Sequence, residues 1–279
     1  MSSKNGAKKK KSKARVGYEA ARILALAVFL ACAGIIGDKI YGYLHADETE
    51  TKWKQVEKIE YIGVTPEPPQ RTAPPYPEVT PERITYPQIV TMDELERLEQ
   101  YEDFVCWLYI DGSDISNYVA QAEDNEFYLR KNLAHETVQT GSLFLDFRND
   151  KEMSSRHNII YGHNQKNGTM FSDLRAFGDP DYFRAHPLIY TYTTKGVRIW
   201  KVFSAYETNT DDYYIETWFE SGSSYFDFIR TLQDKSFTAT DIVLKSSDIV
   251  LTLSTCHKYS DPNGRFVVHA IQVGEAPLS

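Results

Sequence analysis

The sequence predicts a mainly β domain, a sandwich or a barrel, with helices at its periphery. The main observation is a series of short alternating or apolar runs separated by Gly, Asn, Asp and Pro, which is typical of such folds. These runs lie at residues 106–112, 142–150, 157–164, 188–194, 197–208, 248–256 and 265–273. Helical segments interrupt them at residues 168–186 and 223–234, the second with apolar residues at helical spacing. There is no internal repeat and no GxGxxG loop.

The globular domain is predicted to cover residues 91–279. Thr91 and Glu94 stand three residues apart, which is the spacing of a capping box, and a short helix is expected directly after Thr91. A chain of 279 residues has room for one sizeable domain with accessory segments.

Charge is distributed unevenly along the chain. Residues 1–22 hold eight Lys or Arg and one Glu, and the whole chain sums to −8, so the remainder carries about −15. This acidic body with a basic tip argues against nucleic acid as a partner.

The basic tip precedes an apolar run at residues 23–37, and apolar character resumes at residues 40–44. Two interpretations compete: a cleaved secretory signal and an uncleaved signal-anchor. Because the apolar character continues beyond the possible cleavage site, we favour a transmembrane anchor over residues 23–44. Residues 1–22 would then be cytoplasmic and the rest of the chain extracellular.

Residues 45–90 are predicted to be a juxtamembrane and proline-rich linker. Its first part is polar and helical in character, and residues 65–87 hold eight of the twelve prolines. Such a segment is expected to run extended as a semi-rigid spacer. A docking ligand for a proline-reading domain is the alternative.

The three cysteines, Cys32, Cys106 and Cys256, imply no disulfide framework. Cys32 lies within the predicted anchor. Outside the membrane, Cys106 and Cys256 either pair or remain free thiols. No zinc-type ligand spacing is present, and we expect neither a metal nor another cofactor.

Three residues at predicted strand ends are candidates for catalysis. Cys256 ends an alternating run, where a nucleophilic thiol would be accessible, although a buried structural cysteine is equally compatible with the position. His163 follows a strand and a glycine, which suits a proton-transfer group, whereas a loop histidine is commonly a solvated side chain. Arg265 opens the next strand after a turn, so that strand is expected to lie antiparallel to the one that carries Cys256. Its guanidinium would stabilise an oxyanion there, or would only guard a strand edge.

These residues resemble the sortases, and class B among them. The segment TLSTC (residues 252–256) is similar to the sortase signature around the nucleophile, and YGHNQKNGTMF (residues 161–171) to the class B histidine loop. Similar segments occur from about residue 91 to residue 279. The resemblance implies a closed eight-stranded β-barrel with a helix between the strands at 197–208 and 248–256. It also implies a membrane-anchored enzyme of a Gram-positive cell envelope.

The resemblance further implies a role for each candidate residue. Cys256 would be the nucleophile, His163 the proton-transfer partner and Arg265 the oxyanion-stabilising or substrate-orienting residue. The substrate-binding positions it implies are Asn125, Leu129, Tyr214, Ile215 and Ser254. His257 departs from the family pattern, since other members often carry an acidic or small polar residue there.

The implied reaction is transpeptidation. A secreted protein with a C-terminal sorting signal would be cleaved after a threonine through a thioester, and transferred to an amine of a peptidoglycan precursor (lipid II). A pilin-polymerising enzyme, which uses a lysine amine of a protein subunit, is one alternative. A cysteine protease is disfavoured because Arg265 replaces the usual Asn or Asp orienting residue. A catalytically idle scaffold of the envelope is disfavoured because all three candidate residues are present.

Overall fold

The computed structural model describes residues 34, 36, 60–64, 84–164, 170–258 and 261–278. The chain separates into two units, residues 1–49 and 50–279. In the first unit only Gly34 and Ile36 are described, and both are helical and exposed. None of the helices in these ranges has the length and apolar character needed to cross a membrane. The predicted basic tip, and the predicted anchor apart from these two residues, lie outside the described residues.

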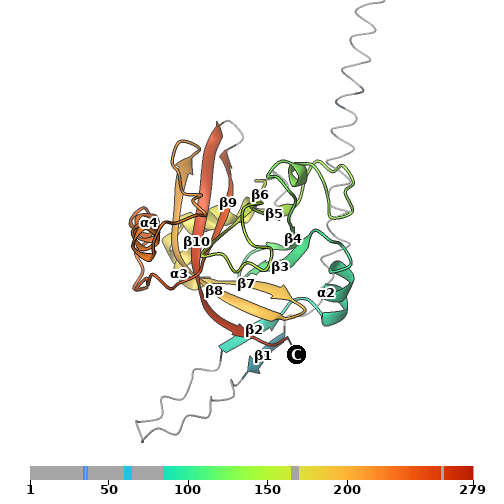
Figure 1. The fold of residues 1–279 in the computed structure, drawn as a ribbon, viewed down its shortest axis with the longest axis horizontal. Helices are drawn as coiled ribbons and strands as arrows, with labels where there is room; N and C mark the ends of the chain where they lie inside the picture. Colours follow the sequence, from blue (N-terminus) through green and yellow to red (C-terminus); the bar gives the residue numbers. More distant parts are fainter. Residues whose placement is uncertain are drawn as a thin grey trace, which may run out of the picture. The chain divides into compact units, whose positions relative to one another are not determined.

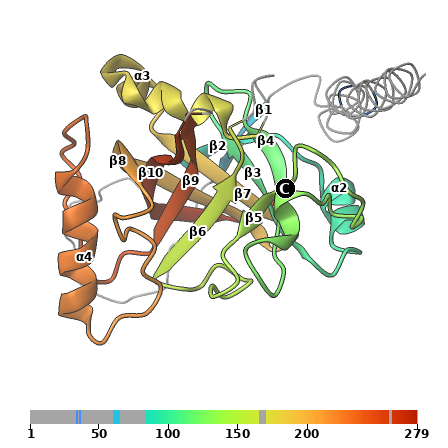
Figure 2. The same ribbon diagram turned by 90° about the horizontal axis from the view of Figure 1, so that it is seen from above.

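Eight strands of the second unit close into a barrel in the order β10-β8-β7-β3-β4-β5-β6-β9 (Figures 1 and 2). The strands are β3 (Phe104–Ile110), β4 (Ser116–Ala120), β5 (Leu143–Leu145), β6 (His157–Gly162), β7 (Leu188–Thr193), β8 (Gly196–Asn209), β9 (Val250–Lys258) and β10 (Asp261–Ala276). Two neighbouring pairs, β4–β5 and β6–β9, are parallel, and the others are antiparallel. The predicted mainly β fold is confirmed, in the form of a closed barrel rather than a sandwich.

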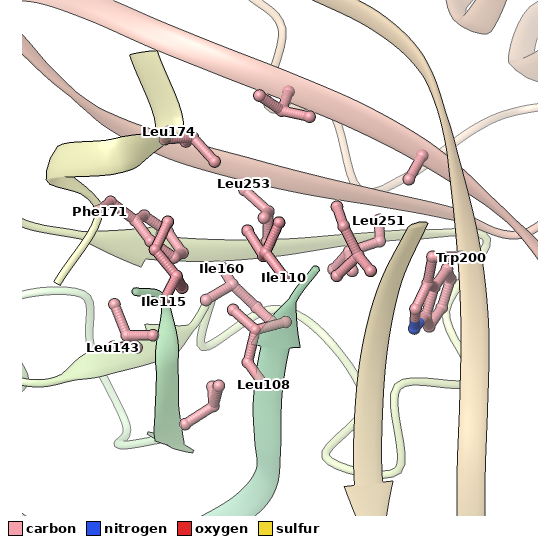
Figure 3. Close-up of a cluster of buried hydrophobic side chains, with 14 of the residues drawn as sticks. Leu108, Ile110, Ile115, Leu143, Ile160, Phe171, Leu174, Trp200, Leu251 and Leu253 are labelled. Carbon is pink, nitrogen blue, oxygen red and sulfur yellow. The ribbon is translucent and has the colours of Figure 1, made fainter. Parts of the chain in front are cut away.

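The barrel interior is filled by apolar side chains from alternate positions of its strands (Figure 3). Leu251 and Leu253 of β9 point into this core together with Ile160 of β6 and Leu108 of β3, and all four are fully buried. Since successive residues of a strand face opposite sides, the residues between them belong to the outer face of the barrel. This alternation decides which residues of β9 belong to the outer wall.

Two of the helices were predicted. Helix α2 (Met92–Leu98) is capped by Thr91, and the predicted capping box with Glu94 is present. Helix α4 (Gly222–Asp234) lies between β8 and β9 in the chain, as expected, and buries Tyr225, Ile229 and Leu232. Both views place α2 and α4 on opposite sides of the barrel (Figures 1 and 2).

The helix expected over residues 168–186 is divided into two. A 3-10 helix, η2 (Ser172–Gly178), is followed by α3 (Pro180–Ala185). Pro180 has no N–H to continue the first helix, and it occupies the first turn of the second. The Asp179 carboxylate caps α3 by accepting hydrogen bonds from the backbone N–H groups of Asp181 and Tyr182.

The segment ahead of α2 is more ordered than the sequence indicates. Residues expected in a helical spacer form strand β1 (Glu60–Val64), which pairs antiparallel with β2 (Ile84–Gln88) at the end of the proline-rich stretch. Tyr86 is fully buried, and its hydroxyl donates to the carbonyl of Pro277 at 2.7 Å. The carbonyl of Pro87 accepts a hydrogen bond from the Tyr192 hydroxyl at 2.6 Å. The packed part of the chain therefore begins before Thr91.

Strand β4 and the short 3-10 helix η1 (Phe127–Leu129) were not predicted. The β4 sequence SNYVA begins with two polar residues, which hide the alternating pattern. Asn117 is nevertheless buried, and its side-chain oxygen accepts a hydrogen bond from the backbone N–H of Tyr118.

A buried polar chain crosses three adjacent strands on the outer face of the barrel. Nδ1 of His157 lies 2.6 Å from the carbonyl oxygen of Glu216, and its Nε2 lies 2.6 Å from the Thr252 hydroxyl. The same hydroxyl lies 2.7 Å from Nδ1 of His269. A carbonyl only accepts, so Nδ1 of His157 carries the proton. Thr252 then donates to His157 and accepts from His269. His269 is thus a fully buried residue of the outer face of the barrel.

Both histidines are expected to make the stability of the fold depend on pH. Burial lowers the pKa of His157 to about 4, and burial together with His157 lowers the pKa of His269 well below its usual value. The unfolded chain therefore binds protons below about pH 6.5 that the folded chain does not. Stability is full above that pH and is lost as the pH falls, by up to about 1.4 kcal/mol per pH unit for each histidine.

Urea unfolding of the full-length protein between pH 7.5 and pH 5 measures this slope. His269→Gln should flatten it. A slope that is the same in the variant and the wild type would show that the buried chain does not control the acid sensitivity.

Candidate active site

Cys256 and Arg265 lie on the neighbouring strands β9 and β10, and His163 directly follows β6, which is the other neighbour of β9. In the antiparallel pairing of β10 with β9, Arg265 is the direct partner of Cys256, so the predicted arrangement of these two strands is confirmed. In the parallel pairing of β6 with β9, Gly162 is the partner of Thr255. His163 follows Gly162 as Cys256 follows Thr255. The backbone register therefore brings all three positions to one level at one edge of the barrel wall.

The alternation of β9 assigns these positions to the outer face. Leu253 points into the core, whereas the Ser254 hydroxyl lies 2.7 Å from the hydroxyl of Tyr214 outside the barrel. Residue 256 falls on the same face of the strand as residue 254. Arg265 is half-buried, and its guanidinium donates to the carbonyl of Gly264 at 2.8 Å.

His163 is held at both its ring and its backbone. Nε2 of the ring lies 3.0 Å from the carbonyl oxygen of Leu129, and the His163 carbonyl accepts from the N–H of Phe171 at 2.9 Å. Since the Leu129 carbonyl only accepts, Nε2 carries the proton, and Nδ1 is the nitrogen left to exchange a proton. Burial lowers the pKa of His163, and this outweighs the opposing effect of the Leu129 carbonyl. The ring is therefore mainly neutral at pH 7.

Two glycines permit this placement. Gly162 has no side chain, and a Cβ there would lie 2.6 Å from the ring of Phe171. Gly141 adopts φ 61°, and a Cβ there would lie 2.6 Å from the carbonyl oxygen of Leu129. A larger residue at Gly141 would displace the Leu129 carbonyl that holds His163, and one at Gly162 would displace the side chain of Phe171.

The second thiol of the barrel, Cys106, is unsuited to nucleophilic chemistry. It is 1% exposed in β3, next to the sulfur of Met153, and burial raises its pKa to about 12. Such a thiol is ionised in about one molecule in ten thousand at pH 8.

We therefore expect Cys106 to resist iodoacetamide in the folded protein and to react only after unfolding. Peptide mass spectrometry of the full-length protein, labelled before and after denaturation, measures this for each cysteine separately. Rapid native labelling of Cys106 would mean that β3 opens readily.

The five predicted substrate-binding positions lie near these strand ends, in two segments and on β9. Asn125 and Leu129 come from the segment around η1, and Leu129 provides the carbonyl that holds His163. Tyr214 and Ile215 come from the segment between β8 and α4, and Tyr214 contacts Ser254 of β9. Tyr214 and Ser254 are both buried. Their side chains therefore support the outer face of the barrel and offer little free surface to a substrate.

Three residues that sequence reasoning did not single out connect these segments. Asp146 and Arg148 follow β5, and Tyr161 lies in β6 two residues before His163. The Asp146 carboxylate accepts hydrogen bonds from Arg148, Tyr161 and Asn125. The available signal was an acidic residue and a basic residue, two positions apart, after an apolar strand. Such a pair usually indicates only a polar turn.

The barrel and the strands that carry these residues match a known family. The model of the sortase domain matches residues 108–273, which is more than half of the chain. The chain belongs to the sortase family. Its match includes every predicted site residue, from Asn125 to Arg265.

The relatives of this sortase belong to class B. Sortase B of Listeria monocytogenes is 38% identical over 180 residues, which are 63% of this chain and 72% of the relative. Sortase B of Staphylococcus aureus is 34% identical over 179 residues, which are 63% of this chain and 73% of the relative.

Solved structures agree with this class. A Staphylococcus aureus sortase B–substrate complex matches with a TM-score of 0.61 and 33% identity, over 67% of this chain and 87% of that chain. Clostridium perfringens sortase B matches with a TM-score of 0.61 and 31% identity, over 64% of this chain and 99% of that chain. The protein is a class B sortase, and therefore a cysteine transpeptidase.

Proposed function

We propose that this sortase cleaves a C-terminal sorting signal of secreted proteins after a threonine and transfers the protein to an amine of a peptidoglycan precursor. The observation that carries the proposal is the pairing of Cys256 with Arg265, with His163 at the same level directly after the adjoining strand β6. A cysteine, a cation and a proton-transfer group at one edge of the barrel suit acyl transfer through a thioester.

In the first half of the reaction, the Cys256 thiolate attacks the threonine carbonyl and a C–S bond forms. Arg265 stabilises the negative charge on the carbonyl oxygen. Protonated His163 then donates its proton from Nδ1 to the leaving amine as the C–N bond breaks. Because burial favours neutral His163, the thiolate–imidazolium pair is a minor population of the free enzyme.

In the second half, an amine attacks the thioester. Neutral His163 accepts a proton from that amine, the C–S bond breaks, and a new amide forms while the thiolate leaves. The acceptor is an amine of lipid II in this proposal. A lysine amine of a pilin subunit would undergo the same steps.

The proposal places the catalytic domain outside the cell. The lysine-rich residues 1–22 and the apolar residues 23–44 support a single-pass anchor with the N-terminus in the cytoplasm. In the sequence, the proline-rich residues 65–83 separate the segments that form β1 and β2. Sorting-signal recognition is also supported by the solved substrate complex of the Staphylococcus aureus relative.

The test uses the full-length protein in detergent, a library of threonine-containing peptides and two amines. One amine is a small mimic of the lipid II amine, and the other is a lysine peptide. Mass spectrometry should detect a peptide adduct on Cys256 and then an amide product with the cell-wall mimic. Preference for the lysine peptide would favour the pilin alternative. A folded protein that forms no adduct with any peptide would favour the envelope scaffold.

A further inference from the structure

Asp146 is a fully buried carboxylate next to the candidate site, and the mechanism above assigns it no role. Burial alone would raise its pKa, but hydrogen bonds from Arg148 and Tyr161 outweigh burial and hold the pKa below its usual range. The carboxylate is therefore charged at neutral pH. A buried charge is retained only where its partners satisfy it, so the arrangement of those partners is informative.

The first partners belong to the side of the site that carries His163. Nδ2 of Asn125 donates to Asp146 at 3.1 Å, and the side-chain oxygen of Asn125 accepts from the N–H of Phe147 at 3.1 Å. The Tyr161 hydroxyl donates to the same carboxylate oxygen at 2.8 Å. Asp146 thus connects β6 to the 125–129 segment, whose Leu129 carbonyl holds His163.

The remaining partner reaches the opposite side of the site. Arg148 donates from Nε to one oxygen of Asp146 at 2.8 Å and from a terminal nitrogen to the other at 2.7 Å. The same terminal nitrogen donates to the carbonyl of Ile215 at 3.0 Å. The 214–216 segment is thereby connected to the carboxylate, and Tyr214 of this segment contacts Ser254 on the cysteine strand.

We propose that Asp146 and Arg148 are positioning residues that fix the spacing between the 125–129 and 214–216 segments, and so determine how tightly the sorting peptide binds. This inference rests on the proposed function, because the two segments carry the predicted substrate-binding positions. Neither residue acts on the reacting atoms. The planar guanidinium is essential to the arrangement, since one fork contacts both carboxylate oxygens and the Ile215 carbonyl.

Two variants of the full-length protein test the proposal. Asp146→Asn removes the charge at nearly constant volume. Arg148→Lys keeps a cation beside the buried carboxylate, which favours folding, but loses the fork. Asp181→Asn is the matched control, because Asp181 pairs with Arg184 on the exposed surface of α3.

For both test variants we expect the KM for the sorting peptide to rise at least about tenfold while kcat changes by less than about threefold, as for lost binding that is common to ground and transition state. The rate at which iodoacetamide alkylates Cys256 should stay within about twofold of wild type, since this small reagent needs no groove. Asp181→Asn should match wild type in every measurement.

Two results would overturn the proposal: unchanged KM in folded Asp146→Asn and Arg148→Lys proteins, or alkylation of Cys256 that falls in step with kcat/KM. If Asp146→Asn does not fold, Arg148→Lys alone decides. If the folded wild type turns over no peptide, the proposed function fails. Amide hydrogen exchange then tests whether Asp146 and Arg148 connect the 125–129 and 214–216 segments. Faster exchange in both the 125–129 and 214–216 segments of Arg148→Lys would support the connection, and a change in only one would contradict it.

Discussion

Cys256→Ala is expected to abolish turnover of the sorting peptide, by at least about a thousandfold, and to leave the barrel folded. Among the described residues of the barrel, no other thiol is suited to form the proposed thioester, because Cys106 lies in the core with a raised pKa. The measurement is amide product per minute by mass spectrometry, with the thermal midpoint of each protein determined in parallel.

Cys106→Ala is the matched control for this variant. It removes a buried sulfur and should lower the thermal midpoint slightly, yet keep the rate of product formation. Undiminished turnover by Cys256→Ala would refute the assignment of the nucleophile. Loss of turnover in Cys106→Ala alone, with a folded barrel, would point to the wrong thiol.

Arg265→Lys is expected to reduce kcat/KM by about a hundredfold, the loss typical of removing one donor from an oxyanion site. Lysine keeps the positive charge, but its compact ammonium cannot reproduce the planar fork of arginine. Arg265 is the partner of Cys256 in the backbone register. The variant therefore lacks a guanidinium at the level where the substrate carbonyl is proposed to lie.

The control for the kinetic comparison is Arg184→Lys. Arg184 is exposed on α3, so this variant makes the same arginine-to-lysine change away from the site. Arg265→Lys should lower kcat more than it raises KM if the arginine acts on the transition state. Wild-type kinetics in Arg265→Lys would remove this residue from the mechanism.

The strands of the barrel other than β4 were predictable because each carries its own apolar or alternating pattern. The relation of Cys256 to Arg265 was also predictable, because a short turn joins their strands and dictates antiparallel pairing. The position of His163 at the level of Cys256 was harder to predict from the sequence, because β6 and β9 pair in parallel and are far apart in the chain.

Long-range packing explains what the sequence did not reveal. β1 and β2 have no local signal of pairing, and a proline-rich stretch separates them. Asp146 has the appearance of a turn residue, and its burial depends on contacts with Asn125 and Tyr161 from other segments. The division of the helix at Asp179 and Pro180 was visible in the sequence, since proline favours the first turn of a new helix.

We expect the parallel pairing of β6 with β9 also to govern when the protein becomes reactive. Its partners, such as Gly162 and Thr255, are distant in the chain, and pairings of this kind form late because the intervening loop loses entropy when it closes. A chain that has not yet closed its barrel holds Cys256 without His163 at its level. On the proposed mechanism its thiol then lacks the proton-transfer partner, and acyl transfer begins only once the barrel has closed.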